Sequence, residues 1–110
     1  RMAKLLPVSG AFHSTLMQPA LDGLRSELES LVINTPSCPI YSNFTAQPTT
    51  DVEEIRSNLL NQLLNPVRWT QTLLNMMEND ATSFVEVGPG KVLQGLVKRT
   101  NRKAEISGHQ

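Results

Sequence analysis

One histidine stands out as a side chain that could carry out acid–base chemistry. His13 follows an apolar run at residues 5–8 and a short turn that contains Gly10, and it directly precedes Ser14, a residue type that caps helices. In open α/β folds, reactive side chains gather in the loops beyond the carboxyl ends of strands. An unperturbed imidazole, with a pKa of about 6.5, can take up and return a proton near neutral pH. We therefore interpret His13 as a candidate general base.

A general base acts on a nucleophile, and no hydroxyl or thiol group in the sequence has the setting of one. Neither Ser9 nor Ser14 sits on a strand-to-helix elbow flanked by glycines, the setting that makes a serine a nucleophile. Cys38 lies in a proline-flanked apolar segment with no basic residue beside it, and we interpret it as structural. We therefore expect the chain to be part of a longer enzyme whose nucleophile lies elsewhere.

The composition excludes several classes of partner. Ten basic and ten acidic side chains cancel, and no run of like charge marks a surface for nucleic acid or for a membrane. No apolar run approaches the roughly 18 to 20 residues that span a bilayer, and no signal peptide is recognised. We expect a soluble intracellular protein that acts on small molecules and holds no metal.

Hydrophobic periodicity, caps and chain breakers predict alternating strands and helices. Asp51 is expected to cap one helix, Pro19 to bend the start of another, and Pro66 to separate two helices. The predicted strands are residues 5–8, 39–45, 83–87 and 106–107, and the predicted helices are residues 14–32, 51–64, 67–77 and 91–99.

The order of these elements predicts an α/β fold with a mainly parallel sheet flanked by helices. Three or four strands are few for such a sheet, so we expect it to continue outside these residues. The Gly-Pro-Gly run at residues 88–90 precedes a predicted helix, whose free N–H groups could bind a phosphate, as in a flavodoxin-like nucleotide-binding module. The same run also serves as a simple tight turn, and both interpretations stay open.

Four sequence blocks, in a fixed order, carry a resemblance to a known family. The chain resembles the C-terminal third of a malonyl-CoA:acyl carrier protein transacylase, the acyltransferase of fatty acid and polyketide synthesis. The blocks are residues 7–14 (PVSGAFHS), followed by Leu16 and Met17, then residues 41–45 (YSNFT), residues 62–69 (QLLNPVRW) and residues 86–93 (EVGPGKVL).

The resemblance implies a two-step transfer through a serine that is absent from these residues. His13 matches the family's catalytic histidine, which takes the serine proton and returns a proton to the leaving thiol. Gln62 falls where the family uses a backbone carbonyl to orient that imidazole. A carbonyl acceptor fixes the proton on Nδ1 and leaves Nε2 free, the role that a carboxylate has in a Ser-His-Asp triad.

The resemblance also assigns two candidate substrate-binding residues. Phe12 precedes the base, and related domains with Ala-Phe-His at this place are selective for malonyl over methylmalonyl groups. Steric exclusion of a methyl group in this way discriminates by only about 1 to 3 kcal/mol. Asn43 either lines the acyl pocket or bonds its own turn. The arginine that binds the malonyl carboxylate, and the oxyanion-hole donors, are expected outside the chain.

The resemblance sets the expectation for the whole protein. Residues 1–110 are expected to form the C-terminal part of an α/β-hydrolase-like large subdomain, without the nucleophile and without the small ferredoxin-like subdomain, and to be inactive alone. The substrates are malonyl-CoA and phosphopantetheinylated acyl carrier protein, with no bound cofactor. The parent protein is expected to be monomeric and cytoplasmic, with a mitochondrion or plastid as the alternative. A noncatalytic relative that docks a carrier protein is an alternative function.

Overall fold

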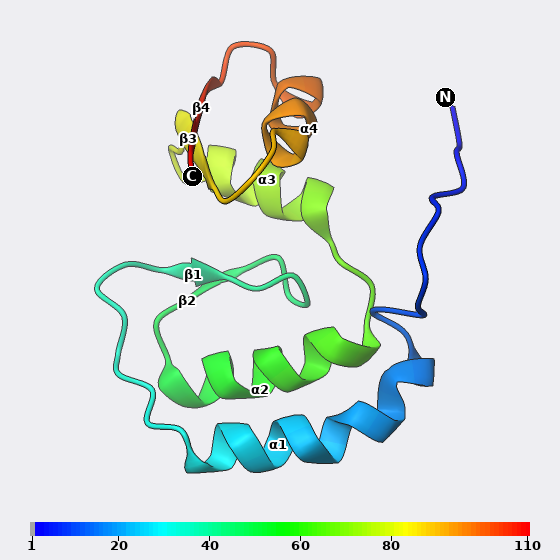
Figure 1. Ribbon diagram of the computed structural model, residues 1–110. Coiled ribbons are helices and arrows are strands. Elements are labelled where there is room, and N and C mark those ends of the chain that lie inside the picture. The colour runs from blue at the N-terminus through cyan, green and yellow to red at the C-terminus, as the bar shows by residue number, and fades with distance from the viewer. Residues whose placement is uncertain (1) are drawn as a thin grey trace. The chain divides into compact units, whose positions relative to one another are not determined.

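The computed structural model describes residues 2–110, which divide into two compact units (Figure 1). The first unit is Arg1–Val67 and the second is Arg68–Gln110. The first contains two α-helices, one 3-10 helix and a short hairpin, and the second contains two α-helices and two parallel strands. The fold class is therefore α/β, as the alternation of elements predicted.

The first helix of the chain differs from the continuous helix predicted over residues 14–32. A 3-10 helix, η1 (Thr15–Ala20), is followed directly by α1 (Leu21–Ser30). Ser14 caps η1, because its side chain accepts a hydrogen bond from the N–H of Leu16. Pro19 lies inside η1 and has no N–H for an α-helical ladder, which accounts for the bend predicted at this point.

The predicted strand at residues 39–45 is wrong for most of its length. Only β1 (Ile40–Tyr41) is extended, and it pairs antiparallel with β2 (Pro48–Thr49). The chain turns instead of continuing because the Ser42 hydroxyl accepts the Phe44 N–H and the Ala46 N–H donates to the Ser42 carbonyl, at 3.0 and 2.8 Å. Polar side chains that bond their own backbone favour turns over strands.

Helix α2 (Val52–Leu64) begins and ends where the sequence predicts. The Asp51 carboxylate accepts the Glu54 N–H at 2.8 Å, and the helix ends at Asn65, which is extended because it precedes Pro66. The guanidinium of Arg56 donates to the carbonyls of Leu28 and Leu31 and so joins α2 to the end of α1. Figure 1 shows α1 and α2 running side by side within this unit.

The second unit is built around a βαβ arrangement. Helix α3 (Trp69–Glu78) leads into β3 (Ser83–Val87), α4 (Val92–Thr100) and β4 (Glu105–His109). Strands β3 and β4 pair in parallel from Ser83 with Glu105 to Val87 with His109, so the last strand is longer than predicted. The core consists of Leu73, Val97 and Ala104, with Trp69, Met77, Phe84 and Ile106 packed against it.

Two further expectations are corrected. Residues 5–8 form no strand, and Leu5 and Leu6 are 95% and 72% exposed, because no other described strand lies alongside them. The single, mainly parallel sheet is replaced, within residues 2–110, by two separate two-stranded sheets, of which one is antiparallel. Cys38 is a free, exposed cysteine, and its interpretation as structural stays a prediction.

Candidate active site

His13 has an unusual backbone conformation. Its φ angle is 59°, in the left-handed region that residues other than glycine adopt at some energetic cost. The turn is held by Ser14, whose hydroxyl donates to the carbonyl of Ala11 at 2.6 Å. The turn therefore projects the His13 side chain from the segment just before η1.

The His13 ring lies against the end of α2. Its Nδ1 atom is 2.8 Å from the backbone carbonyl oxygen of Gln62, a residue 49 positions away in the sequence. A carbonyl oxygen only accepts hydrogen bonds, so this contact requires the proton on Nδ1. The neutral ring then carries its lone pair on Nε2, where it can accept a proton.

The Gln62 carbonyl is available because of the residue that follows α2. In an α-helix the carbonyl of residue 62 would accept the N–H of residue 66, but Pro66 has no N–H. The neighbouring carbonyl of Asn61 is already occupied by the side-chain amide of Asn65, at 2.7 Å. The end of α2 thus leaves the Gln62 carbonyl for the imidazole.

The other two candidate site residues are less closely connected to His13. Phe12 is 61% exposed, and its ring covers Gly10 so closely that a Cβ atom there would lie 2.9 Å from the ring. Asn43 is half-buried in the turn between β1 and β2, and in the described part of the chain no hydrogen bond joins it to His13. The structure thus brings together His13 and Gln62, whereas Phe12 adjoins His13 only in sequence.

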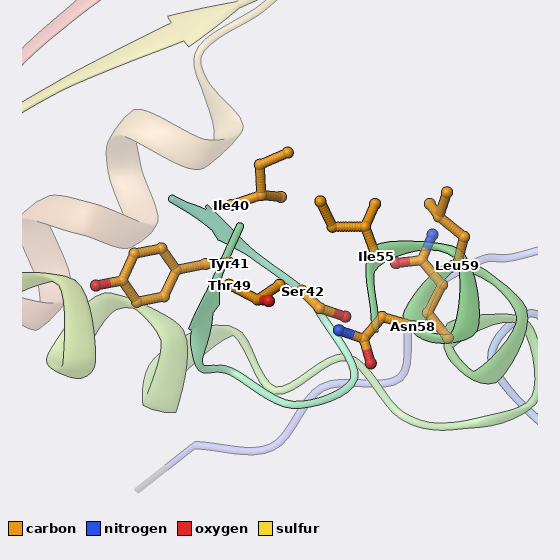
Figure 2. A pocket seen from close by; sticks show the side chains of 8 residues that line it. Ile40, Tyr41, Ser42, Thr49, Ile55, Asn58 and Leu59 are labelled. Carbon is orange, nitrogen blue, oxygen red and sulfur yellow. The ribbon is translucent and has the colours of Figure 1, made fainter. Parts of the chain in front are cut away.

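A small hollow lies beside Gln62, between α2 and the β1–β2 hairpin (Figure 2). Its volume is about 90 Å³, and it is lined by Ile40, Tyr41, Ser42, Thr49, Ile55, Asn58, Leu59 and Gln62. Asn58 is only 6% exposed, and among residues 2–110 its side-chain Nδ2 has no hydrogen-bond partner. The sequence analysis missed Asn58, although a polar residue between Ile55 and Leu59 on the apolar face of a helix was a usable signal.

A side-chain carboxylate lies at the start of the helix that follows the Gly-Pro-Gly turn. Gly88 and Gly90 have φ angles of 127° and 86°, which other residues rarely adopt. The two carboxylate oxygens of Glu86 accept the N–H groups of Leu93 and Gln94, each at 3.2 Å. Because a negative charge already occupies the start of α4, the geometry favours the tight-turn interpretation over nucleotide binding.

Two general features of the described residues bear on other kinds of site. Within residues 2–110 no three or more His, Cys, Asp or Glu side chains gather in a group able to hold a metal ion. No helix in that part of the chain has the length and apolar character needed to cross a membrane.

Comparison with known proteins finds one family and many relatives. The sequence profile of the acyl transferase domain family matches residues 1–109. The chain is 42% identical over 98 residues to the malonyl CoA-acyl carrier protein transacylase of Bacillus subtilis, a match covering 89% of this chain and 31% of that protein. It is 41% identical over 108 residues to the mitochondrial malonyl-CoA-acyl carrier protein transacylase of Mus musculus, covering 94% of this chain and 28% of that protein.

Solved structures give the same result. The structure of a malonyl-transacylase in complex with its type II polyketide synthase acyl carrier protein superposes with a TM-score of 0.83 and 39% identity. That match covers 94% of this chain and 33% of the solved one. The α/β fold seen here is therefore similar to part of solved transacylase structures, and the chain spans only about a third of their length.

Proposed function

Because this chain belongs to the acyl transferase domain family, we propose that the full-length protein transfers malonyl groups from malonyl-CoA to the phosphopantetheine thiol of an acyl carrier protein. The named relatives are malonyl-CoA transacylases, and one solved relative is bound to its acyl carrier protein. The observation in this chain that carries the proposal is the contact of His13 Nδ1 with the Gln62 carbonyl.

In the proposed mechanism, His13 acts as the base through Nε2. It takes the proton of a serine outside these residues as the serine oxygen attacks the thioester carbonyl. The C–S bond to coenzyme A then breaks, and the proton on Nε2 passes to the leaving thiolate. In the second half, His13 takes the proton of the carrier-protein thiol, the thiolate attacks the malonyl-serine ester, and the serine oxygen leaves with that proton.

The Gln62 carbonyl supports both halves of this cycle. Each time His13 becomes an imidazolium, the positive charge on its Nδ1–H is shared with the carbonyl oxygen 2.8 Å away. The contact also prevents the ring from rotating out of line with the serine. Gln62 is thus a positioning residue that acts through its main chain.

We place residues 1–110 in the C-terminal part of an α/β-hydrolase-like large subdomain. The chain spans 31% of the Bacillus subtilis relative, which leaves most of such an enzyme unaccounted for by these residues. The serine nucleophile, the carboxylate-binding arginine and a small ferredoxin-like subdomain would then lie outside them. This placement would supply further strands beside the short sheets described above.

Phe12 and Asn43 are proposed to contact the acyl group. The Phe12 ring is exposed immediately before the base, where its bulk would oppose an α-methyl substituent on the substrate. Asn43 lies in the turn that follows β1 and would line the pocket that holds the acyl group. The substrates need no bound cofactor for this chemistry, since the serine and the imidazole perform every bond exchange.

The oligomeric state, the partners and the compartment of the full-length protein are part of the proposal. We propose a monomeric protein whose partners are a coenzyme A thioester and an acyl carrier protein. Its relatives include a bacterial protein and a mitochondrial one. The bacterial cytoplasm is our first proposal, and an organelle is the second.

A transfer assay with a matched control tests the proposed function. In the full-length protein, His13→Ala should slow malonyl transfer to phosphopantetheinylated acyl carrier protein by about 10² to 10⁴-fold, the usual contribution of a general base. His109→Ala removes the second histidine of residues 1–110, which is exposed in β4, and should leave the rate unchanged. Equal loss in both variants, or no transfer by the folded wild-type protein, would contradict the proposal.

A further inference from the structure

The hollow beside Gln62 contains a buried polar group that no protein atom satisfies. Asn58 is 94% shielded from solvent, given its 6% exposure, and its Nδ2 has no partner among the described residues. A buried amide N–H without an acceptor is strongly unfavourable, and native proteins pair nearly all such groups with protein or with ordered water. Asn58 therefore requires an acceptor inside the hollow.

The opposite wall of the hollow carries two hydroxyl groups. Figure 2 shows the Asn58 amide pointing from α2 toward Ser42 and Thr49 of the hairpin. The Thr49 hydroxyl has no free proton, because it donates to Glu54; it also accepts the Asp51 N–H, each bond being 3.1 Å long. The Ser42 hydroxyl accepts the Phe44 N–H at 3.0 Å but, within residues 2–110, donates to no acceptor.

Asn58 and Ser42 are thus two donors that face one hollow without bonding each other. A single acceptor placed between them would satisfy both. A water molecule fits this requirement, because its oxygen accepts two hydrogen bonds and its protons remain free for other partners. The volume of about 90 Å³ exceeds the roughly 10 to 15 Å³ that one water needs.

The position of Asn58 on α2 connects this hollow to the candidate active site. Asn58 lies one helical turn before Gln62, and both side chains line the hollow. In an α-helix the carbonyl of residue 58 accepts the N–H of residue 62, so a fixed Asn58 also fixes the peptide that precedes the Gln62 carbonyl. That carbonyl is the atom that contacts Nδ1 of His13.

We infer that Asn58 and Ser42 hold a bound water that ties α2 to the β1–β2 hairpin, and that Asn58 is thereby a positioning residue for the Gln62 carbonyl and the His13 imidazole. The effect on catalysis rests on the function proposed above. The bound water and the orientation of the imidazole do not depend on that function, so both can be measured without any assay of malonyl transfer.

Two substitutions on α2 separate this role from a general effect on the helix. Asn58→Leu keeps the size of the side chain, removes its N–H group and makes the hollow apolar. Asn61→Leu is the matched control, because Asn61 lies on the same helix and does not line the hollow, and its hydrogen-bonding partners among the described residues, helix bonds aside, are Ser57 and Asn65. Asn58→Ala is the second variant, used if the leucine variant does not fold.

The primary readout is the protonation pattern of His13 in the full-length protein. Nitrogen-15 NMR of labelled histidine, assigned by the loss of one signal pair in His13→Gln, measures the fraction of neutral ring with its proton on Nδ1. We expect that fraction to fall in Asn58→Leu and to stay unchanged in Asn61→Leu. An unchanged fraction in folded Asn58→Leu, or in Asn58→Ala where that variant is used, would overturn the positioning role.

Two further measurements complete the test. A crystal structure of the wild-type protein should show a water within hydrogen-bond distance of Asn58 Nδ2 and Ser42 Oγ, and a protein side chain in that place would overturn the water site. Asn58→Leu should lower the acylation rate about fivefold to tenfold without raising KM for malonyl-CoA, since a displaced catalytic group lowers the chemical step. If wild-type protein transfers no malonyl group yet the NMR result holds, the proposed function fails and the positioning inference stands.

Discussion

His13 and Gln62 make one contact that determines what the imidazole can do. The 2.8 Å hydrogen bond from Nδ1 to the carbonyl leaves Nε2 as the only ring atom that can accept a proton from a nucleophile. The positive φ of His13, 59°, shows that the backbone adopts a costly conformation to place the ring there. Backbone cost of this kind is often found at functional sites.

The role of Gln62 predicts an asymmetry between its side chain and its main chain. Gln62→Ala removes the side chain but keeps the carbonyl that contacts His13, so we expect malonyl transfer to fall by less than about threefold, far below the effect of losing the base. Steady-state transfer assays of Gln62→Ala and His13→Ala, side by side, check this. A loss in Gln62→Ala comparable to that in His13→Ala would show that the side chain, and not the carbonyl, is needed.

At the residue scale, the sequence predicts His13 from its setting but reaches Gln62 only through a family resemblance. The reason is that Gln62 acts through a backbone atom, and every residue has a carbonyl. Asn58 could have been noticed in the sequence as a polar residue on the apolar face of the predicted helix, but the sequence does not show whether its amide is paired. Its buried, unpaired amide became visible only with the hairpin in place.

Among the elements, α2 positions the base because of how it ends. Asp51 fixes its start, and Pro66 withholds the N–H that would otherwise bond the Gln62 carbonyl. Both signals are local in sequence, which is why the bounds of α2 were predicted well. The same holds for β3 and for the end of α3, which are set by nearby turn residues.

Pro66→Ala tests the importance of this helix end. The alanine N–H can donate to the Gln62 carbonyl and extend α2 by one turn, so it competes with His13 for the same oxygen. We expect slower acylation by about tenfold with little loss of thermal stability, since alanine favours helix. The acylation rate and the melting temperature of the full-length variant would be measured together, and an unchanged rate would mean that the carbonyl bonds His13 regardless.

The elements that were predicted wrongly depend on partners far away in the sequence. Residues 39–45 have the composition of a strand, yet hydrogen bonds of Ser42 turn the chain after two residues. Residues 5–8 are apolar and have no described strand beside them. Pairing between strands is non-local, so β-forming composition alone could not determine which segments would join a sheet.

The whole chain has two units, each with apolar surface that its own residues do not cover. Val87 in β3 is 78% exposed and Val92 at the start of α4 is 74% exposed. The chain also spans only 31% of the length of its Bacillus subtilis relative. Both facts fit the proposal that these residues supply the base and its support to a larger enzyme, in which other segments supply the nucleophile.

This proposal makes a prediction for the 110 residues alone. With His13 but no elbow serine, the isolated chain should acquire no malonyl adduct from malonyl-CoA, whereas the full-length protein should acquire one. Intact-mass spectrometry of both, under the same conditions, checks the difference. A stable adduct on the isolated chain would mean that one of its own side chains is the nucleophile.

The most direct test of His13 as the base is a rapid-quench mass measurement on the full-length protein. Wild type, His13→Ala and the control His109→Ala are mixed with malonyl-CoA, and the malonyl adduct is followed over time. We predict rapid formation of one adduct in the wild type and the control, and formation slower by about 10² to 10⁴-fold in His13→Ala. An adduct that forms equally fast in folded His13→Ala would contradict the assignment of His13 as the base.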